Sequence, residues 1–95
     1  MEIKKLTQIP YGNAFVEIDT DNGNIYLWSY RTLVAKVENN WLTINGLYSM
    51  TTRRHIGAFM REYTPFDYHT AKQIYTDNLA LDITTGEVVE RDTAK

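Results

Sequence analysis

Residues 14–31 read A-F-V-E-I-D-T-D-N-G-N-I-Y-L-W-S-Y-R, two runs of alternating apolar and polar side chains on either side of Asn22-Gly23. Alternation of this kind is typical of a half-buried strand. Asn-Gly between two such runs indicates a hairpin, because both residues tolerate the positive φ angles of a type I′ turn. We therefore predict a hairpin whose loop is Asn22-Gly23 alone. The expected cross-strand partners are Asp21 with Asn24, Ile18 with Leu27, and Val16 with Ser29.

This register divides the hairpin into an aliphatic face and a face of aromatic and acidic residues. Antiparallel sheets commonly bury one face and expose the other to water, so we expect the aliphatic side to form the core. The aliphatic face contains Val16, Ile18, Ile25 and Leu27. The opposite face contains Phe15, Glu17 and Asp19 across from Tyr30, Trp28 and Tyr26.

Two further alternating segments, Leu33–Glu38 and Trp41–Asn45, predict a second hairpin. Asn39-Asn40 is the expected turn, because Asn adopts positive φ more readily than most residues. The core side then contains Leu33, Ala35, Val37, Leu42 and Ile44. The other side contains Val34, Lys36, Glu38, Trp41 and Thr43.

Both ends of the chain carry weaker strand signals. Glu2–Ile9 is expected to be a short edge strand or an extended arm within residues 1–10, which Pro10 and Gly12 would end. The alternation of Leu79, Leu81 and Ile83 before a Thr85-Gly86 turn predicts a last strand. Residues 90–95 are expected to form a frayed tail.

A helical cover for the aliphatic face is predicted after Thr51-Thr52, because threonine is suited to capping a helix. We expect this helix to extend over Arg53–Glu62. The i, i+3, i+4, i+7 spacing of an amphipathic helix is met by Ile56, Phe59, Met60 and Tyr63.

A second helix is predicted at Thr64-Pro65-Phe66-Asp67, with Thr64 as the cap, Pro65 at the first helical position and Asp67 three residues after the cap. Its end is expected near Asn78. Its apolar stripe is Tyr68, Ala71 and Tyr75. The predicted fold is therefore α+β in a single domain over residues 1–95, an antiparallel β-meander of four to five strands with two short helices packed on one face.

Bulk composition argues against several classes of protein. The 95 residues carry a net charge of −2, and the ten Lys/Arg and twelve Asp/Glu are dispersed, so no strong field attracts the chain to nucleic acid or membrane. No apolar run reaches the ~20 residues of a membrane span. The chain has no cysteine and Met1–Pro10 does not resemble a signal peptide, which suits the cytoplasm of a bacterial host cell.

The sequence contains no motif for catalysis, cofactor binding or metal binding, so we expect no enzyme activity, no cofactor and no metal site. Its five glycines form no phosphate loop. The two histidines, His55 and His69, lack the spacing of a metal site or a catalytic triad. His55 follows Thr52 by three residues, so we expect its neutral ring to bond back to the helix cap.

Aromatic and cationic residues are the candidates for a partner-binding site. Cross-strand rings stabilise a sheet, whereas contiguous exposed rings favour an interface, and both explanations remain open. The arginines either form a solvated helix face or bind phosphate or the carboxylates of a partner. Acidic neighbours on the aromatic face favour protein over nucleic acid as the partner. The candidates are Tyr26, Trp28, Tyr30, Trp41, Arg53, Arg54 and Arg61.

Residues 27–37 read L-W-S-Y-R-T-L-V-A-K-V, and residues 46–59 read G-L-Y-S-M-T-T-R-R-H-I-G-A-F. This stretch, about a third of the chain, resembles a family of small proteins encoded by phages and other mobile elements of Firmicutes. Small mobile-element proteins without enzymatic motifs often inhibit host defence, and several resemble anti-CRISPR proteins, which occupy the surface of an RNA-guided nuclease. The matching positions are Ser29-Tyr30, Thr32, Val34-Ala35, Tyr48-Ser49, Thr51-Thr52, His55-Ile56 and Phe59.

We therefore expect a non-enzymatic phage or mobile-element protein that binds a host protein. The resemblance implies a CRISPR effector nuclease as the partner and inhibition as the effect. The alternative is a small nucleic-acid-binding accessory protein whose arginines contact phosphates. A third hypothesis is a homodimer that pairs its aromatic faces in a structural role.

Overall fold

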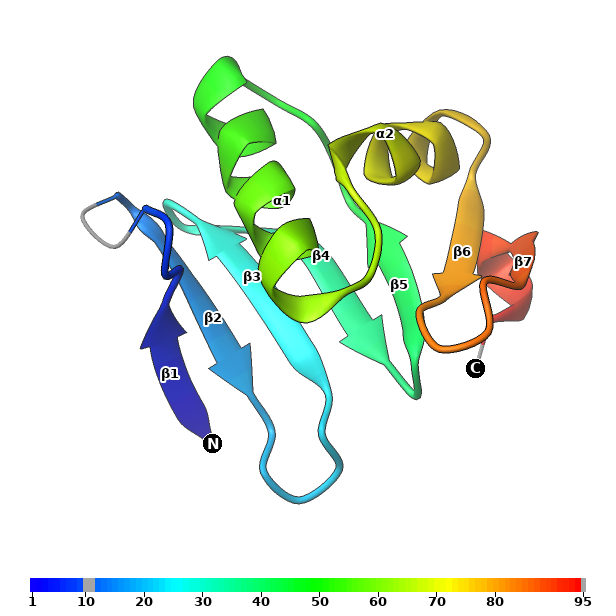
Figure 1. Ribbon diagram of the computed structural model, residues 1–95, viewed down its shortest axis with the longest axis horizontal. Helices are drawn as coiled ribbons and strands as arrows, with labels where there is room; N and C mark the ends of the chain where they lie inside the picture. Colours follow the sequence, from blue (N-terminus) through cyan, green and yellow to red (C-terminus); the bar gives the residue numbers. More distant parts are fainter. Residues whose placement is uncertain (10–11, 95) are drawn as a thin grey trace.

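The computed structural model describes residues 1–9 and 12–94, which form an antiparallel sheet of seven strands with two α-helices on one side (Figure 1). The strands are β1 (Glu2–Lys5), β2 (Ala14–Ile18), β3 (Ile25–Ser29), β4 (Thr32–Glu38), β5 (Trp41–Ile44), β6 (Leu79–Asp82) and β7 (Val88–Glu90). The helices are α1 (Met50–Tyr63) and α2 (Tyr68–Thr76), and a short 3₁₀-helix, η1 (Arg91–Thr93), follows β7. The predicted α+β class is confirmed, and the sheet has more strands than the four to five expected.

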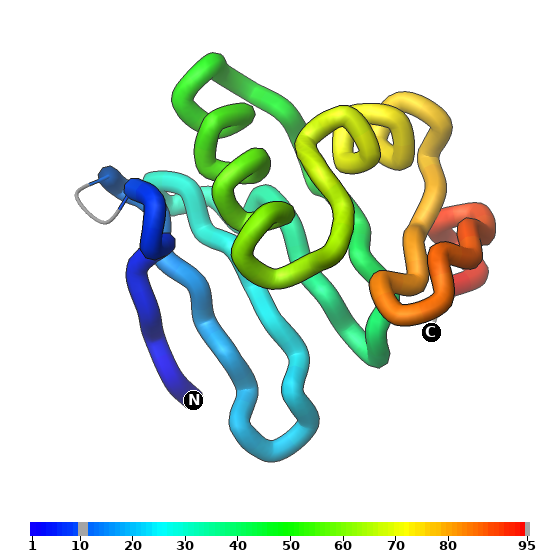
Figure 2. Tube along the Cα trace, viewed as in Figure 1, coloured from blue at the N-terminus to red at the C-terminus, as the bar shows by residue number. Residues whose placement is uncertain are grey.

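The strands pair in chain order from β1 to β7, so the sheet is a meander into which α1 and α2 are inserted between β5 and β6. β1 and the C-terminal segment lie at opposite edges of this sheet (Figure 2). The N-terminal segment is therefore an edge strand, paired with β2 from Glu2 opposite Ile18 to Lys5 opposite Phe15. Pro10, one of its two expected stop residues, lies outside the described residues.

The first hairpin forms as predicted, but its predicted register is wrong by two residues. Ile18 lies opposite Ile25 instead of Leu27, and the Asp19 backbone N–H donates to the Asn24 carbonyl at 2.9 Å, which leaves residues 20–23 as the loop. In this loop only Gly23 has a positive φ, so the turn is not type I′. Because the shift is an even number of residues, each side chain keeps its predicted face.

The second hairpin contains the type I′ turn, because Asn39 and Asn40 have φ angles of 53° and 72°. Its strand β4 differs from prediction at a β-bulge, where the register against β3 shifts between Leu27 and Trp28. Leu33 now pairs with Trp28, and the extra residue Val34 turns into the core with no exposed surface. The bulge therefore exchanges the predicted faces of Leu33 and Val34.

α1 begins three residues before its predicted start, because Ser49 rather than Thr51-Thr52 is the N-cap. The Ser49 hydroxyl accepts a hydrogen bond from the Thr52 backbone N–H at 3.2 Å. The predicted apolar stripe is confirmed, since Ile56, Phe59 and Met60 are fully buried and Tyr63 packs against the core.

The predicted cap of α2 is wrong. Thr64 ends α1 instead, where its hydroxyl donates to the Met60 carbonyl at 2.7 Å, and Asp67 is the N-cap of α2 through a 3.2 Å bond from the Thr70 backbone N–H. The predicted stripe is also wrong at one position, because Tyr75 is 40% exposed while its neighbour Ile74 is buried.

The C-terminal residues are folded, in contrast to the predicted tail. β7 pairs with β6, and the turn between them contains Gly86 at φ 81°, as expected for Thr85-Gly86. Arg91 anchors the following segment by donating from Nη1 to the Ile44 carbonyl at 2.7 Å and from Nη2 to Asn45 Oδ1. The last residue of the predicted tail, Lys95, lies outside the described residues.

The core lies between the helices and the aliphatic face of the sheet, as predicted. Leu27 and Val16 have no exposed surface, and Ile18 and Ile25 pack partly buried at its border. α1 contacts β3 and β4, and α2 contacts β5 and β6, so the two helices divide the sheet between them. Among the described residues, neither α1 nor α2 covers the reverse side of the sheet (Figure 1).

Candidate functional site

The sheet face that α1 and α2 leave uncovered, which we call the open face, presents a row of aromatic rings. Trp28 lies opposite Phe15 with its ring stacked at a centroid distance of 6.2 Å and an interplanar angle of 11°. Both rings lie on the predicted face but with different partners, since the sequence register placed Tyr30 opposite Phe15. The half-buried members of the open face are Phe15, Glu17, Tyr26, Trp28, Leu33, Lys36, Glu38 and Trp41.

The polar edges of two rings on the open face are bonded to carboxylates. Trp28 Nε1 donates to Glu17 Oε1 at 3.1 Å, and the Tyr26 hydroxyl donates to Glu38 Oε2 at 2.9 Å. Lys36 Nζ pairs with Glu38 Oε1 at 3.0 Å, and the bonds from Lys36 and then Tyr26 lower the pKa of Glu38. Burial, followed by the bond to Glu38, raises the pKa of the Tyr26 phenol. These hydrogen bonds thus hold the two half-buried rings in defined orientations.

Trp41 belongs to a different environment at the far end of the open face. A hollow of about 330 Å³ lies there between Trp41 and the residues of η1, among them Arg91 and Asp92. Thr43 lines it too, and the buried Oγ1 of Thr43 has no hydrogen-bond partner among the described residues. The sequence prediction missed this hollow because it treated the C-terminal segment as a frayed tail.

Tyr30 is not on the open face, although it was predicted there. It lies in the turn between β3 and β4 at φ 58°, and its ring centroid is 6.1 Å from that of His55 on α1. Tyr30 is 52% exposed and also lines a hollow with Phe15, so it stands at the end of the sheet between its two sides.

Beside Tyr30, the exposed Ser49 and three buried polar side chains form a hydrogen-bonded network. Ser49 Oγ donates to Thr52 Oγ1 at 3.2 Å, Thr52 Oγ1 and Ser29 Oγ lie 3.4 Å apart, and Ser29 Oγ and His55 Nδ1 lie 2.8 Å apart. His55 therefore bonds to β3 rather than to its own helix cap as predicted. These residues also carry the family resemblance noted in the sequence, so its spaced polar positions come together in space.

The Ser29–His55 pair resembles a nucleophile beside a base, but its burial argues against catalysis. Ser29 is 2% exposed and His55 3% exposed, so no substrate atom reaches the hydroxyl. Burial, followed by the charge of Arg54, lowers the pKa of His55 and favours the neutral ring. The pair is best explained as a structural link between α1 and the sheet.

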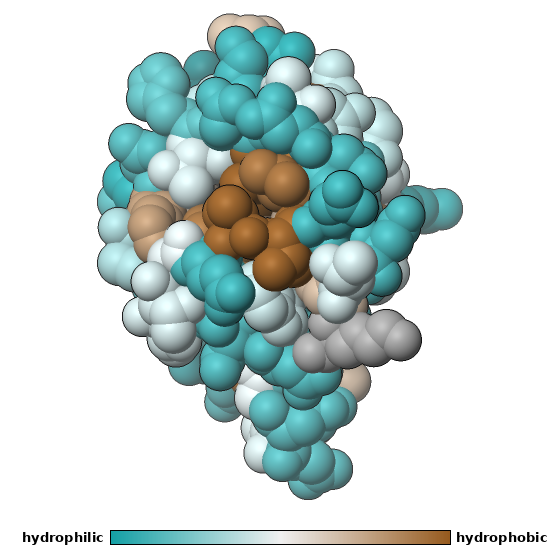
Figure 3. All heavy atoms as spheres, turned by 90° about the vertical axis from the view of Figure 1, so that its right-hand side faces the viewer, coloured by the Kyte–Doolittle hydropathy of each residue, from teal (hydrophilic) through white to brown (hydrophobic). Residues whose placement is uncertain are grey.

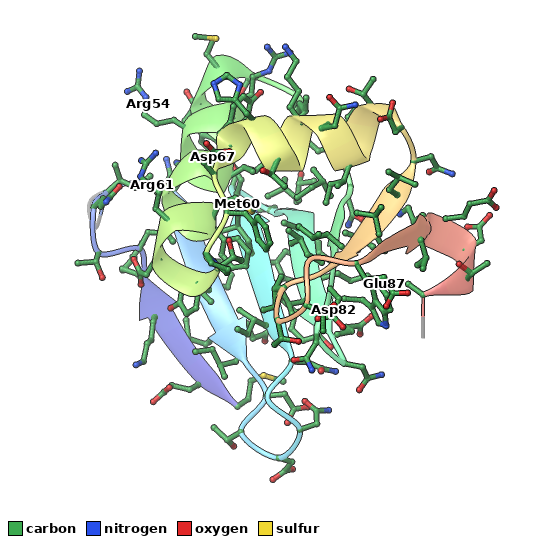
Figure 4. The ribbon with its side chains drawn as sticks, turned by 45° about the vertical axis from the view of Figure 1, so that its right-hand side comes forward. Arg54, Met60, Arg61, Asp67, Asp82 and Glu87 are labelled. Atoms are coloured by element: carbon green, nitrogen blue, oxygen red, sulfur yellow. The ribbon has the colours of Figure 1, made fainter. Side chains whose placement is uncertain are left out.

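The three candidate arginines line one groove on the helix layer, which we call the cationic groove. α1 contributes Met50, Arg53, Arg54, Gly57 and Arg61 to it, and α2 contributes Tyr68 and Lys72. Its volume is about 440 Å³. Figure 4 shows Arg54 and Arg61 projecting from the same side of α1, whereas Met60 points toward the sheet. Lys72 was missed because its approach depends on how α2 packs against α1.

The cationic groove and the open face lie on opposite sides of the sheet. The groove is formed by the helix layer, and the open face is the side that this layer leaves bare (Figure 1). The predicted site residues therefore do not form one surface: Tyr26, Trp28 and Trp41 share the open face, the arginines share the groove, and Tyr30 stands apart.

A third surface is an apolar hollow at the β6–β7 end of the molecule. Figure 3 shows apolar side chains gathered around it within a polar surround. Its volume is about 470 Å³, and α2 and the β6–β7 hairpin both contribute to its wall. The apolar residues that line it are Phe66, Ile74, Leu79, Leu81 and Val88.

Neither a cluster of metal-binding side chains nor a helix able to cross a membrane is present in the described part of the chain. Over residues 1–9 and 12–94, no three or more His, Asp or Glu side chains are grouped so that they could hold a metal ion. Within the same part of the chain, neither helix is both long and apolar enough to cross a lipid bilayer.

Comparison with known proteins gives one match. Residues 1–79 match the model of a family of unknown function, DUF8033. No curated protein and no solved structure is significantly similar to the chain. The matched residues include the open-face aromatics, the polar network and every residue of the cationic groove. The match carries no information on the mobile-element resemblance, which stays a prediction.

Proposed function

The chain belongs to this family of unknown function, and we propose that it is a non-enzymatic protein that acts by binding another protein through its open face. The observation that carries the proposal is the row of half-buried rings of Phe15, Trp28 and Tyr26 on a sheet face without a helical cover. Trp and Tyr dominate the energetics of protein interfaces. Their fixed orientation means that little side-chain entropy is lost on binding.

Protein is a better partner than nucleic acid for this face because of its acids. Glu17 and Glu38 lie between the rings and accept their hydrogen bonds, so carboxylate charge is built into the row. A phosphate backbone would be repelled there, whereas the backbone and basic side chains of a protein would not.

The partner that we favour is a defence protein of a bacterial host, in the first place a CRISPR effector nuclease that the chain would inhibit in the cytoplasm. Support for this choice comes from the resemblance of residues 27–59 to small mobile-element proteins. A direct test adds the chain to a purified RNA-guided nuclease and measures cleavage of its target DNA. Full cleavage at a hundredfold molar excess of the chain, with nucleases of several Firmicutes hosts, would remove this partner.

The open face is tested by substituting its two tryptophans. The double variant Trp28→Thr, Trp41→Thr keeps strand-forming residues while it removes both indole rings. We expect its affinity for a protein captured from host lysate and identified by mass spectrometry to fall by more than tenfold. The matched control is Tyr48→Asn, Tyr75→Thr, which removes two exposed rings outside the open face and should bind as before. Asparagine is used at position 48 because it tolerates the positive φ of this residue. Equal loss in both variants would contradict the proposal.

Sedimentation distinguishes binding of a foreign protein from a homodimer that pairs its open faces. If the chain sediments as a dimer and the double tryptophan variant as a monomer, the rings serve self-association instead of a foreign partner.

The second candidate function, nucleic-acid binding, is favoured by one observation, the four cations of the cationic groove. Four phosphate contacts would give a slope of log K against log salt of about −3.6 on duplex DNA. Filter binding at two salt concentrations measures that slope, and no retention at low salt would eliminate this candidate.

A further inference from the structure

We infer that the cationic groove is a docking site for a short acidic peptide segment of a partner protein, anchored by one apolar side chain. This site is separate from the open face and does not depend on the function proposed for it. Its elements are the guanidinium groups of α1, Lys72 of α2, and a floor of Met50, Gly57 and Tyr68.

α1 places its arginines where folding does not favour them. Arg53 and Arg54 occupy the fourth and fifth positions of a helix that begins at Met50, and the first turn contains no acid. The positive end of the helix dipole favours acids there and disfavours cations. Local helix energetics therefore do not account for the two arginines, whereas an external anion would gain from the dipole and both side chains.

Within the described residues, the cations of the groove have no carboxylate partner. The ion pairs among the described residues are Lys4–Glu2 and Lys36–Glu38, and neither includes a cation of the groove. Arg61 is instead held by Gln8, whose Oε1 accepts from Arg61 Nε at 3.1 Å and from Nη2 at 2.9 Å. Its remaining nitrogen, Nη1, lies near Gly57: a Cβ atom added to this glycine would be 3.7 Å from the Arg61 Nη1 atom. One guanidinium is thus already oriented toward the groove.

The floor of the groove is apolar and open. Met50 is 75% exposed, and an exposed methionine adapts its shape to different apolar partners. Gly57 stands in the middle of α1, where glycine is unfavourable for a helix, and its missing side chain leaves the floor open next to Tyr68. A floor of this kind accepts an apolar side chain, and the cations around it accept the flanking carboxylates.

The same features favour an acidic peptide over nucleic acid. The chain as a whole has a net charge of −2, so its long-range field opposes a polyanion of many charges. Bases stack on broad aromatic platforms, whereas the floor has a single aromatic ring, Tyr68. A peptide with a few carboxylates and one apolar residue uses both the charges and the floor.

The experiment measures fluorescence anisotropy of a rhodamine-labelled twelve-residue peptide at 25 and 250 mM NaCl. The peptide has four Glu residues flanking a central Leu-Phe pair, either of which can serve as the apolar anchor, and Gly and Ser at its other positions. Two further probes are the same peptide with Gly-Gly at its centre and a twenty-nucleotide poly-dT strand. We expect the Leu-Phe peptide to bind most tightly, the Gly-Gly peptide at least threefold more weakly, and both more weakly at the higher salt.

The groove variant is Arg53→Ala, Arg54→Ala, Lys72→Ala, which should weaken binding of the Leu-Phe peptide by at least tenfold. Its matched control, Lys4→Ala, Lys5→Ala, Arg31→Ala, removes three exposed cations elsewhere and should change the affinity by less than twofold. Met50→Ser tests the floor and should cost about threefold. Circular dichroism melting of each variant confirms that the fold is retained.

Three results would overturn the inference: no peptide binding at 25 mM NaCl, equal loss in the groove and control variants, or tighter binding of poly-dT than of the peptide. The Trp28→Thr, Trp41→Thr variant should still bind the peptide fully. If this variant loses binding of the host partner but keeps binding of the peptide, the result for the open face is independent of the result for the groove.

Discussion

Leu27 and Trp28 are neighbours on β3, yet they lie on the two faces of the sheet and are held in different ways. Leu27 has no exposed surface and is packed beneath the helices, whereas Trp28 is half-buried, stacked on Phe15 and bonded to Glu17. The covered face thus depends on close packing, which is sensitive to volume. The open face depends on pairwise contacts between half-buried side chains. We therefore assign stability and binding to opposite sides of one strand.

The largest expected difference is between Leu27→Ala and Trp28→Ala. Leu27→Ala should lower the free energy of unfolding by about 2–5 kcal/mol, because it leaves a cavity in the core. Trp28→Ala removes more atoms but should cost about 1–2 kcal/mol, the sum of a cross-strand pair and one partly exposed hydrogen bond. Urea unfolding of both variants measures the difference. A greater loss for Trp28→Ala would mean that the open face is part of the stabilising core.

The bulge in β4 sharpens the comparison, since it decides which of two adjacent residues is buried. Val34→Ala should cost about 2 kcal/mol of unfolding free energy, because Val34 is fully buried. Leu33→Ala, on the half-buried side next to Trp28, should cost about half as much. The simple alternation of the sequence predicts the opposite order, so the midpoints of urea unfolding distinguish the two registers.

The link between the two layers, Ser29–His55, should make stability depend on pH. Burial lowers the pKa of His55 in the folded state below its ordinary value of 6.5, so the unfolded chain takes up the proton first. The stabilisation is complete above pH 6.5 and is lost as the pH falls from there through the lower folded pKa. Each unit by which the pKa is lowered corresponds to about 1.4 kcal/mol.

The measurement for this prediction is the melting temperature between pH 7.5 and 5, compared with that of His55→Gln. The variant should be less stable at pH 7.5 but should lose less on acidification. Asp67 and Asp82 have lowered pKa values because of their hydrogen bonds to Thr70 and to Thr84, so their contributions are lost only as the pH falls below about 3.8, outside this range. If the melting temperatures of the unsubstituted chain and of His55→Gln fell in parallel with pH, another group would control the loss of stability.

The smallest expected effects are those of the two hairpin turns. Asn40→Gly should raise the unfolding free energy by about 0.5 kcal/mol, because Asn40 has φ 72° and glycine adopts that conformation without strain. Asn22→Gly should lower it slightly, since Asn22 accepts the Asn24 backbone N–H at 2.9 Å and does not have a positive φ. Chemical denaturation in duplicate resolves the sign. If both substitutions raised the free energy of unfolding, the result would support the type I′ turn predicted at Asn22-Gly23.

Much of the fold follows from local patterns in the sequence. The alternation around Val16 and Leu27 predicts the buried face, and the spacing of Ile56, Phe59 and Met60 predicts the buried stripe of α1. The errors occur where two local signals compete. Thr64 and Asp67 both suit a helix cap, and the chain uses the first to end α1 and the second to begin α2.

The candidate site was only partly accessible to sequence reasoning. The rings and arginines are recognisable by residue type, and the sequence placed Trp28 and Tyr26 on the correct face. It could not reveal that the arginines lie on the other side of the molecule from the rings, or that Lys72 joins them. Contacts between residues far apart in the chain depend on how whole elements pack, which no local spacing encodes.

By itself, the sequence determined which side chains avoid water, because the periods of strand and helix sort apolar residues onto one side whatever the exact register. Only the tertiary structure decided the bulge at Val34, the bond between Ser29 and His55, and the anchoring of Arg91 on Ile44 and Asn45. Each of these depends on filling the space and satisfying the polar groups between elements, and that requirement exists only once the layers are brought together.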